Sequence, residues 1–230
     1  MEGTVALVGS GEYLPSMRPI EKMLLENRPP RFVQIATAAV PDGDERVAYW
    51  HDLGRAQAES LGVTCVIATV ANRDEANNPR FVELIRNAGL IYLSGGHPGF
   101  LADVLRDTAL WHQIVAEWRQ GASLAGCSAG AMAMCSWVPS LRHPFDNGVR
   151  GLGLFPRLRV IPHFDAFYQR VPSIVDRFIH GKDESVSLIG IDEETAIVGG
   201  PVNWTVVGRG SAWRLDGERI QLPAGSVLTL

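Results

Sequence analysis

Short apolar runs alternate with longer helical segments along the first half of the chain, and this alternation limits the fold more than any other feature. The runs expected as strands are 5–8, 31–36, 64–68, 90–93 and 123–126, and the segments between them with helical spacing are 17–25, 44–61, 80–87 and 100–120. Strands joined by helices form crossover units and therefore a mainly parallel sheet. The sequence thus predicts a three-layer α/β fold whose functional site lies at the carboxyl ends of the strands.

After residue 185 the chain reads as short strands separated by Gly, Pro and Asp. The expected strands are 186–191, 195–198, 203–207, 212–215 and 226–230. We expect them to form an antiparallel flank that closes the same domain. A chain of 230 residues is long enough for one large α/β domain, and it shows no linker or internal repeat. Residues 1–230 are therefore predicted to form a single domain.

Composition narrows the class of protein and its partners. The net charge is −4, which lacks the basic surplus that nucleic-acid binding needs, so no nucleic-acid partner is expected. Apolar residues make up 46% and charged residues 20% of the chain, values of a folded globular protein. Three cysteines are too few for a disulfide framework and indicate reduced thiols. These features predict a cytoplasmic protein.

Neither an export signal nor a membrane span is expected. The chain opens without the basic start and long apolar stretch of a signal peptide. Residues 120–141 carry no formal charge and are long enough to span a bilayer, but they are rich in Gly, Ser and Pro. That composition favours a buried strand, a tight turn and a buried helix, so no membrane partner is expected.

A nucleophile elbow is the clearest chemical motif. Gly126-Cys127-Ser128-Ala129-Gly130 fits G-x-S-x-G, lies after an apolar run and precedes a helix of small residues. Such a turn needs tiny residues two positions before and after the serine, and it lifts the central hydroxyl above the sheet. Cys127 is the better intrinsic nucleophile, but it stands one position early and is expected to point sideways into the fold. Ser128 is therefore the predicted nucleophile.

A serine nucleophile needs a base and an acid that orients the base. His163 follows the apolar run 158–162, and His97 follows Gly95-Gly96 at the end of the fourth expected strand. The pattern favours His163 over His97. The orienting acid is either Asp165 or a member of the run Asp192-Glu193-Glu194, and the residues alone leave this open.

Backbone amides complete the expected site. Gly95 and Gly96 allow N–H groups to approach a substrate, and with the N–H of Ala129 they could form an oxyanion hole. Gly9-Ser10-Gly11-Glu12 is not a dinucleotide-binding fingerprint, because position 14 is Leu where a third small residue is expected. The sequence also has no P-loop and no Cys/His cluster with zinc spacing. No metal or organic cofactor is expected.

Taken together, these motifs resemble peptidase family S51, which includes cyanophycinase and aspartyl dipeptidase. The resemblance covers nearly the whole chain and is nearer the cyanophycinase branch; it rests on the ordered elements Gly9-Ser10-Gly11-Glu12, Ser94-Gly95-Gly96, residues 126–131, His163-Phe164, residues 190–196 and residues 206–210. It implies a fold like that of class I glutamine amidotransferases. It also implies a serine peptidase with the triad Ser128, His163 and Glu193 and an oxyanion hole formed by the amides of Gly96 and Ala129.

The chain departs from this family where substrate binds. Cyanophycinases follow the double glycine with Asp-Gln, whereas this chain has His97-Pro98. Cyanophycinases also carry an arginine on the helix after the catalytic histidine. Here Pro172 lies near the expected position of that arginine, and Arg170 is two residues away. His97 and Arg170 are thus candidate substrate-binding residues, and small acidic or isoaspartyl peptides are the expected substrates, rather than cyanophycin itself. An arginine can hold a carboxylate in bidentate fashion, and the candidates flanking the site in sequence are Arg142, Arg150, Arg159 and Arg170.

Two other functions stay open. An amidase or amidotransferase-like enzyme of the same fold would use Asp165 to orient His163, because those enzymes carry His-x-Glu. A binding protein could keep the scaffold without catalysis, although a serine, a histidine and an acid are all present. The expected partner is a small peptide substrate, and a homodimer is also open.

Overall fold

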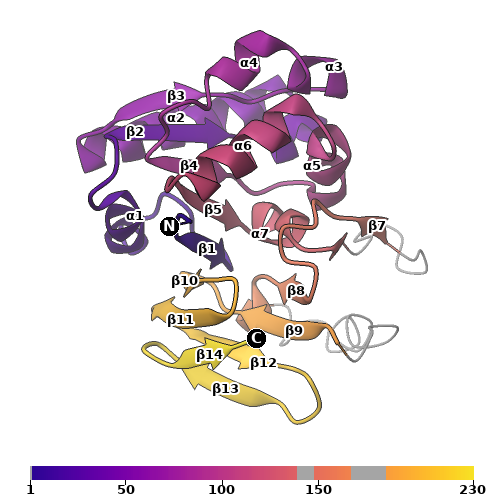
Figure 1. The fold of residues 1–230 in the computed structure, drawn as a ribbon. Coiled ribbons are helices and arrows are strands. Elements are labelled where there is room, and N and C mark those ends of the chain that lie inside the picture. Colours follow the sequence, from indigo (N-terminus) through magenta and orange to yellow (C-terminus); the bar gives the residue numbers. More distant parts are fainter. Residues whose placement is uncertain (1, 139–147, 167–184) are drawn as a thin grey trace.

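The computed structural model describes residues 2–138, 148–166 and 185–230 (Figure 1). Its main sheet has eight strands in the order β14-β11-β10-β1-β5-β4-β2-β3. The strands are β1 Val5–Val8, β2 Arg31–Ile35, β3 Thr64–Ile67, β4 Leu90–Leu93, β5 Ser123–Cys127, β10 Thr195–Gly199, β11 Asn203–Gly208 and β14 Val227–Thr229. The run from β1 to β3 is parallel, and β10, β11 and β14 extend it in antiparallel fashion. The predicted α/β fold is confirmed.

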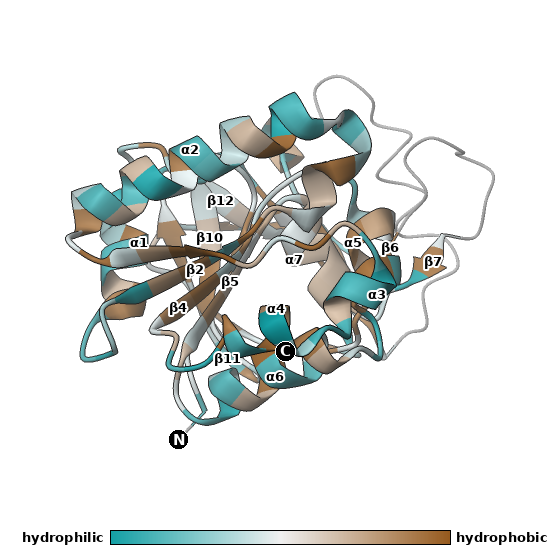
Figure 2. Ribbon diagram, turned by 90° about the horizontal axis from the view of Figure 1, so that it is seen from above, coloured by the Kyte–Doolittle hydropathy of each residue, from teal (hydrophilic) through white to brown (hydrophobic). Residues whose placement is uncertain are grey.

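Helices cover both faces of this sheet, as Figure 2 shows with the apolar strands between them. The helices are α1 Arg18–Leu25, η1 Thr37–Asp42, α2 Asp44–Leu61, α3 Arg73–Ala76, α4 Pro79–Glu83, α5 Pro98–Leu105, α6 Ala109–Arg119 and α7 Ala129–Met134. Helices α1 and α2 pack on one face, and α5, α6 and α7 pack on the other. Three layers result, as the alternation of strands and helices predicts.

The parallel strands are apolar on both sides because both sides are covered. In β1, Val5 and Leu7 face the layer of α5 to α7, whereas Ala6 and Val8 face α1 and α2. All four side chains are at most 1% exposed. Successive side chains of a strand point to opposite faces, so a continuous apolar run is the signature of a strand buried between two helical layers.

A second sheet of four strands packs beside β10 and β11, with the order β13-β12-β9-β8 (Figure 1). Its strands are β8 Leu158–Ile161, β9 Ser187–Ile191, β12 Ser211–Arg214 and β13 Ile220–Pro223. The expected antiparallel C-terminal strands are present, but they divide between the two sheets. Strand β9 also pairs in parallel with β8, which the sequence does not reveal. A two-stranded pair, β6 Trp137–Val138 and β7 Val149–Arg150, lies apart from both sheets.

Some boundaries differ from the expected ones. The helix expected over 80–87 spans Pro79–Glu83. The segment 100–120, for which one or two helices are expected, contains two, and the first begins earlier, at Pro98. Strand β13 was not expected, because its side chains are mostly exposed and lack an apolar alternation. In the part of the chain that the structure describes, no helix is both long and apolar enough to cross a membrane.

Candidate functional site

Ser128 occupies a sharp turn between β5 and α7. Its backbone has φ 49° and ψ −105°, a conformation that costs energy in a residue with a side chain. The flanking glycines make the turn sterically feasible. A Cβ on Gly126 would lie 2.6 Å from the carbonyl carbon of Gly130, and one on Gly130 would lie 2.3 Å from the carbonyl oxygen of Leu93. The turn therefore has the local geometry that G-x-S-x-G predicts.

The parallel pairing of β8 and β9 brings a histidine and a glutamate to the same edge. Ile161 pairs with Gly190, so His163 and Glu193 both follow the carboxyl ends of adjacent strands. The Nδ1 of His163 lies 2.9 Å from Oε1 of Glu193, and its Nε2 lies 3.0 Å from Oγ of Ser128. Like Ser128, His163 has a positive φ, 51°. The structure thus brings together the three residues that the resemblance selects.

This arrangement sets the roles of the imidazole nitrogens. The carboxylate of Glu193 can only accept, so Nδ1 of His163 carries the proton and donates it to Glu193. Nε2 is then an acceptor for the Ser128 hydroxyl. A serine hydroxyl, an imidazole and a carboxylate within hydrogen-bonding distance of each other form the arrangement needed to activate a nucleophile.

The neighbouring carboxylates have other partners. Asp165 accepts from the backbone N–H groups of Glu193 and Ala166, both at 3.0 Å. Asp192 accepts from the N–H of Ser211 and from Nε1 of Trp213, both at 2.9 Å. Burial raises the pKa of Asp192 above its usual range. Glu194 lies 3.0 Å from Nη1 of Arg209. Among Asp165 and the acidic run 192–194, Glu193 is thus the residue whose carboxylate bonds the His163 ring.

The loop after β4 lies beside the elbow. Leu93 pairs with Gly126, and a Cβ on Gly95 would lie 3.7 Å from Cβ of Ser128. Gly96 has φ 138°, and a Cβ there would lie 2.3 Å from the carbonyl oxygen of Ala38, so only glycine fits. Within the described part of the chain, the N–H groups of Gly96 and Ala129 have no hydrogen-bond acceptor. Both amides can therefore serve an incoming oxygen.

His97 contacts a different carboxylate from the one that His163 contacts. Its Nε2 is 2.7 Å from Oδ1 of Asp42, and its backbone N–H donates to Ala38 at 2.7 Å. The histidine at the serine is His163, and His97 forms a second histidine–carboxylate pair one residue after Gly96. Asp42, which ends η1, belongs to no motif that marks it as a partner of His97.

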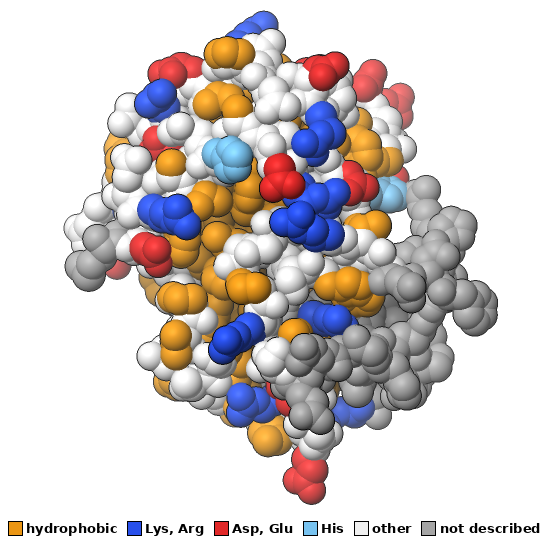
Figure 3. All heavy atoms as spheres, turned by 45° about the vertical axis from the view of Figure 1, so that its right-hand side comes forward, with side chains coloured by type: hydrophobic (Ala, Val, Ile, Leu, Met, Phe, Trp, Pro, Cys, Tyr) orange, Lys and Arg blue, Asp and Glu red, His pale blue; other side chains and the backbone are white. Residues whose placement is uncertain are grey.

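Of the candidate arginines, Arg142 and Arg170 lie outside the described residues. Arg150 lies 3.9 Å from Asp107, and the guanidinium of Arg159 stacks 4.3 Å from the ring centre of Trp137. On the face shown in Figure 3, basic and acidic side chains are interspersed. The two described candidates thus already have partners.

Cys127 is fully buried, and its thiol donates to Oε2 of Glu12 at 2.7 Å. Burial, followed by the negative charge of Glu12, raises the pKa of the thiol well above its usual range. A buried thiol that keeps its proton is a poor nucleophile. Glu12 itself belongs to the segment 9–12, for which sequence reasoning assigned no role beyond the resemblance.

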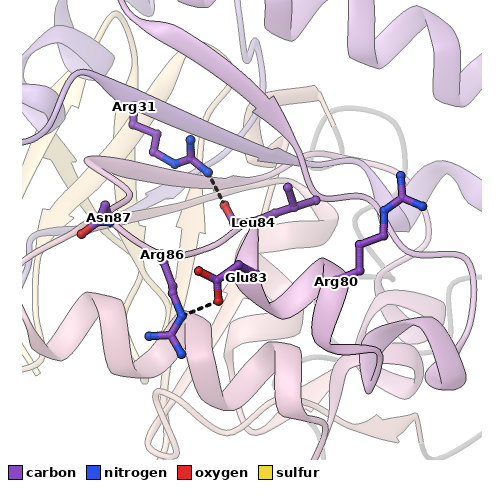
Figure 4. Close-up of a pocket in the computed structure, with 6 residues that line it drawn as sticks. All are labelled: Arg31, Arg80, Glu83, Leu84, Arg86 and Asn87. Carbon is purple, nitrogen blue, oxygen red and sulfur yellow. Dashed lines mark hydrogen bonds and ion pairs between the residues drawn. The ribbon is translucent and has the colours of Figure 1, made fainter.

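The hollow in Figure 4 is remote from Ser128. It is lined by Arg31, Arg80, Glu83, Leu84, Arg86 and Asn87. Arg31 begins β2 and Asn87 precedes β4, so the hollow lies at the amino ends of the parallel strands, opposite the edge that carries Ser128. Its guanidinium groups point in different directions (Figure 4). Among the described residues, no group of three His, Cys, Asp or Glu side chains is placed to hold a metal ion.

Comparisons with known proteins identify the family and the fold. The model of peptidase family S51 matches residues 5–200. The crystal structure of a peptidase from an acI-B1 Actinobacterium is 42% identical, with a TM-score of 0.92, and the match covers 100% of this chain and 98% of that one.

A putative peptidase E protein from Listeria monocytogenes EGD-e is 18% identical, with a TM-score of 0.62, and the match covers 97% of this chain and 99% of that one. At that identity the likeness shows the fold alone. No curated protein matches the chain significantly. Because the family model spans most of the chain and the actinobacterial peptidase matches it from end to end, the chain belongs to peptidase family S51 and is a serine-type peptidase.

Proposed function

We propose that the chain hydrolyses small acidic or isoaspartyl peptides through Ser128, His163 and Glu193. The observation that carries the proposal is the continuous hydrogen-bonded series from the Ser128 hydroxyl through the His163 ring to the Glu193 carboxylate, with steps of 3.0 and 2.9 Å. The strained elbow supports the same assignment, because it places Ser128 beside two N–H groups that have no acceptor among the described residues.

The first half of the reaction forms an acyl-enzyme. His163 Nε2 takes the Ser128 proton as Oγ attacks the peptide carbonyl carbon, and the carbonyl oxygen becomes negative. The N–H groups of Gly96 and Ala129 stabilise this oxyanion. The imidazolium then donates its Nε2 proton to the leaving amine as the C–N bond breaks. Glu193 stabilises the charged ring throughout and holds Nδ1–H in place.

The second half regenerates the serine. Water enters where the amine left, and His163 takes one of its protons as the oxygen attacks the acyl carbon. The tetrahedral intermediate collapses, Ser128 receives the proton from His163, and the product leaves as a carboxylic acid that releases its remaining proton to solvent. Water is the only reactant besides the peptide, and the enzyme returns to its starting protonation state.

The proposed substrate class rests on the resemblance to cyanophycinase and aspartyl dipeptidase, the two members of the family named above. The motifs that surround Ser128, His163 and Glu193 carry that resemblance, whereas His97-Pro98 replaces the pair that cyanophycinases use for substrate. His97 directly follows Gly96, and its Nε2 lies 2.7 Å from Oδ1 of Asp42. When protonated, it is a cation next to the proposed oxyanion hole and is suited to a carboxylate near the scissile carbonyl.

A dipeptide screen tests the proposal. Purified protein is assayed against Asp-X, isoaspartyl and β-Asp-Arg dipeptides, and Ser128→Ala is expected to reduce kcat by about 10⁴–10⁶-fold on any that is cleaved. A fluorophosphonate probe should label the wild type at Ser128. Cys127→Ala is the matched neighbour and should keep most of the activity. A probe adduct on Cys127, or turnover by Ser128→Ala, would refute the assignment.

A further inference from the structure

The turn that follows β1 connects the other parts of the site. Glu12 is 8% exposed, and its two carboxylate oxygens bond different segments. Oε1 accepts the N–H of Gly95 at 2.9 Å, and Oε2 accepts the thiol of Cys127 at 2.7 Å. One side chain thus joins the loop after β4 to the residue immediately before Ser128.

Tyr13, which follows Glu12, bonds the same loop at Ser94, one position before Gly95. The Tyr13 hydroxyl lies 2.9 Å from Oγ of Ser94 and accepts from Nε2 of Gln34 at 3.2 Å. Because Gln34 already donates to the Tyr13 oxygen, the phenol proton is available to bond Ser94. Burial raises the pKa of Tyr13 well above its usual range, so this proton is kept. Consecutive residues 12 and 13 therefore hold consecutive residues 95 and 94.

Aromatic packing fixes the Tyr13 ring. Its ring centre lies 6.2 Å from those of Phe32 and Trp50 and 5.2 Å from that of Tyr92. Phe32 and Tyr92 belong to parallel strands β2 and β4 of the main sheet. The hydroxyl that reaches Ser94 is therefore carried by a ring with little freedom to move.

The chemistry of Glu12 indicates more than packing. A buried carboxylate is costly, and no Lys or Arg among the described residues forms an ion pair with it. A carboxylate can nevertheless accept two donors from two separate segments, which no apolar side chain can do. In the same turn, the carbonyl oxygen of Ser10 accepts the N–H of Glu194 at 3.2 Å. Glu194 directly follows Glu193, the proposed orienting acid.

We propose that Glu12 and Tyr13 are positioning residues that hold the loop 94–96 against the elbow, so that the Gly96 N–H stays aimed at the carbonyl oxygen of the bound peptide. The inference rests on the proposed function, in which the Gly96 amide stabilises the oxyanion. The two residues do not touch the substrate. They act through Ser94 and Gly95.

Two conservative variants test this role. Glu12→Gln replaces the carboxylate that accepts the Gly95 N–H with a neutral amide, which is a weaker acceptor, and Tyr13→Phe removes the hydroxyl but keeps the ring. Loss of one oxyanion donor lowers kcat by about 10²–10³-fold, and a displaced donor should cost less, about 10–100-fold. We expect that loss in kcat with KM changed less than about threefold, because the contact forms only in the transition state.

A second readout separates positioning from general instability. The affinity of each variant for a peptide boronic acid, which forms a tetrahedral adduct with the serine, should fall by the same factor as kcat. Tyr49→Phe is the matched control, because Tyr49 is 51% exposed on α2 and should behave like the wild type. Ser94→Ala combined with Tyr13→Phe should lose no more activity than either change alone, since both break one contact.

The outcomes distinguish this inference from the proposed function. If Ser128→Ala keeps its activity and Ser128 is not labelled, the proposed function fails and this inference fails with it. If Ser128 is essential but Glu12→Gln and Tyr13→Phe keep wild-type kcat and boronate affinity, the positioning role alone is refuted. A rise in KM equal to the fall in kcat would also refute it. Should Glu12→Gln not fold, Tyr13→Phe and Ser94→Ala decide the question.

Discussion

The carboxylate of Asp165 accepts a hydrogen bond of 3.0 Å from the backbone N–H of Glu193. Asp165 thus holds the turn that presents Glu193 to His163. Among enzymes of this fold, an amidotransferase-like mechanism would instead place the residue two positions after the histidine on the imidazole. In the structure, Asp165 bonds the backbone N–H of Glu193, and the carboxylate of Glu193 bonds the imidazole of His163.

Glu193→Gln should therefore be the more damaging change of the two. We expect it to keep the fold and to lower kcat by as much as ~10⁴-fold, because an amide can select the wrong histidine tautomer and does not stabilise imidazolium. Asp165→Asn keeps an oxygen acceptor for the Glu193 N–H and should cost less than about tenfold. Steady-state kinetics on the best dipeptide measures both. If Asp165→Asn proves the more harmful, the amidotransferase-like alternative is favoured over the assignment of Glu193.

Replacement of His163 and replacement of His97 should have clearly different kinetic effects. His163→Ala removes the group that lies 3.0 Å from Ser128 Oγ and should abolish measurable turnover. His97→Ala removes a partner of Asp42 rather than the base at Ser128, so its effect should appear mainly in KM. The initial rates of both variants are measured over a range of dipeptide concentrations, so that kcat and KM are obtained separately. Activity retained by His163→Ala and lost by His97→Ala would reverse the two roles.

Much of the fold could be predicted because its signals are local. Each parallel strand is an apolar run in the sequence, and the elbow is marked by its own two glycines. The division of the last strands between two sheets is not local, since it depends on the parallel pairing of β9 with β8. Strand β13 carries no apolar pattern, because Ile220 and Gln221 are exposed.

The site shows the same contrast. The serine is fixed by a motif of five residues, whereas spacing alone left His97 beside His163 and Asp165 beside Glu193 as alternatives. The contact between Glu12 and Gly95 joins residues 83 positions apart, and nothing in the segment 9–12 reveals it. Such contacts depend on which strands become neighbours, and β1, β5 and β4 become neighbours only in the folded sheet.

An acidic substrate preference should appear as a difference between Asp-X and Asn-X dipeptides. If a cation of the protein holds the substrate carboxylate, kcat/KM should be at least about tenfold higher for Asp-X, since hydrogen bonds to charged groups contribute about 1.5–3 kcal/mol. His97→Gln should narrow the difference if His97 supplies that cation, and Arg170→Gln should do so if the arginine does. Equal kcat/KM for the two dipeptides would argue decisively against a carboxylate-binding group.

A buried acid away from the site should make stability depend on pH. Glu21 on α1 is 2% exposed, and its Oε2 accepts from Nε2 of Gln57 on α2. Its Oε1 is also buried. Burial is the main cause that raises the pKa of Glu21 from 4.5 to about 7. The folded state therefore retains a proton that the unfolded state releases at lower pH.

The sign of the effect follows from that proton. Between pH 4.5 and about 7 the folded chain binds more protons at Glu21 than the unfolded chain, so the contribution of Glu21 to stability falls as pH rises through this window. A pKa difference of this size corresponds to about 3 kcal/mol at 1.36 kcal/mol per pKa unit.

Glu21→Gln keeps an acceptor for Gln57 and has no proton to lose. Relative to the wild type, it should gain most of that stability between pH 5 and pH 8, measured as the free energy of unfolding in urea. Glu59→Gln, an exposed residue of the same helix pair, should show no such gain. A Glu21→Gln variant whose advantage over the wild type is the same at both pH values would show that Glu21 titrates normally in the folded protein.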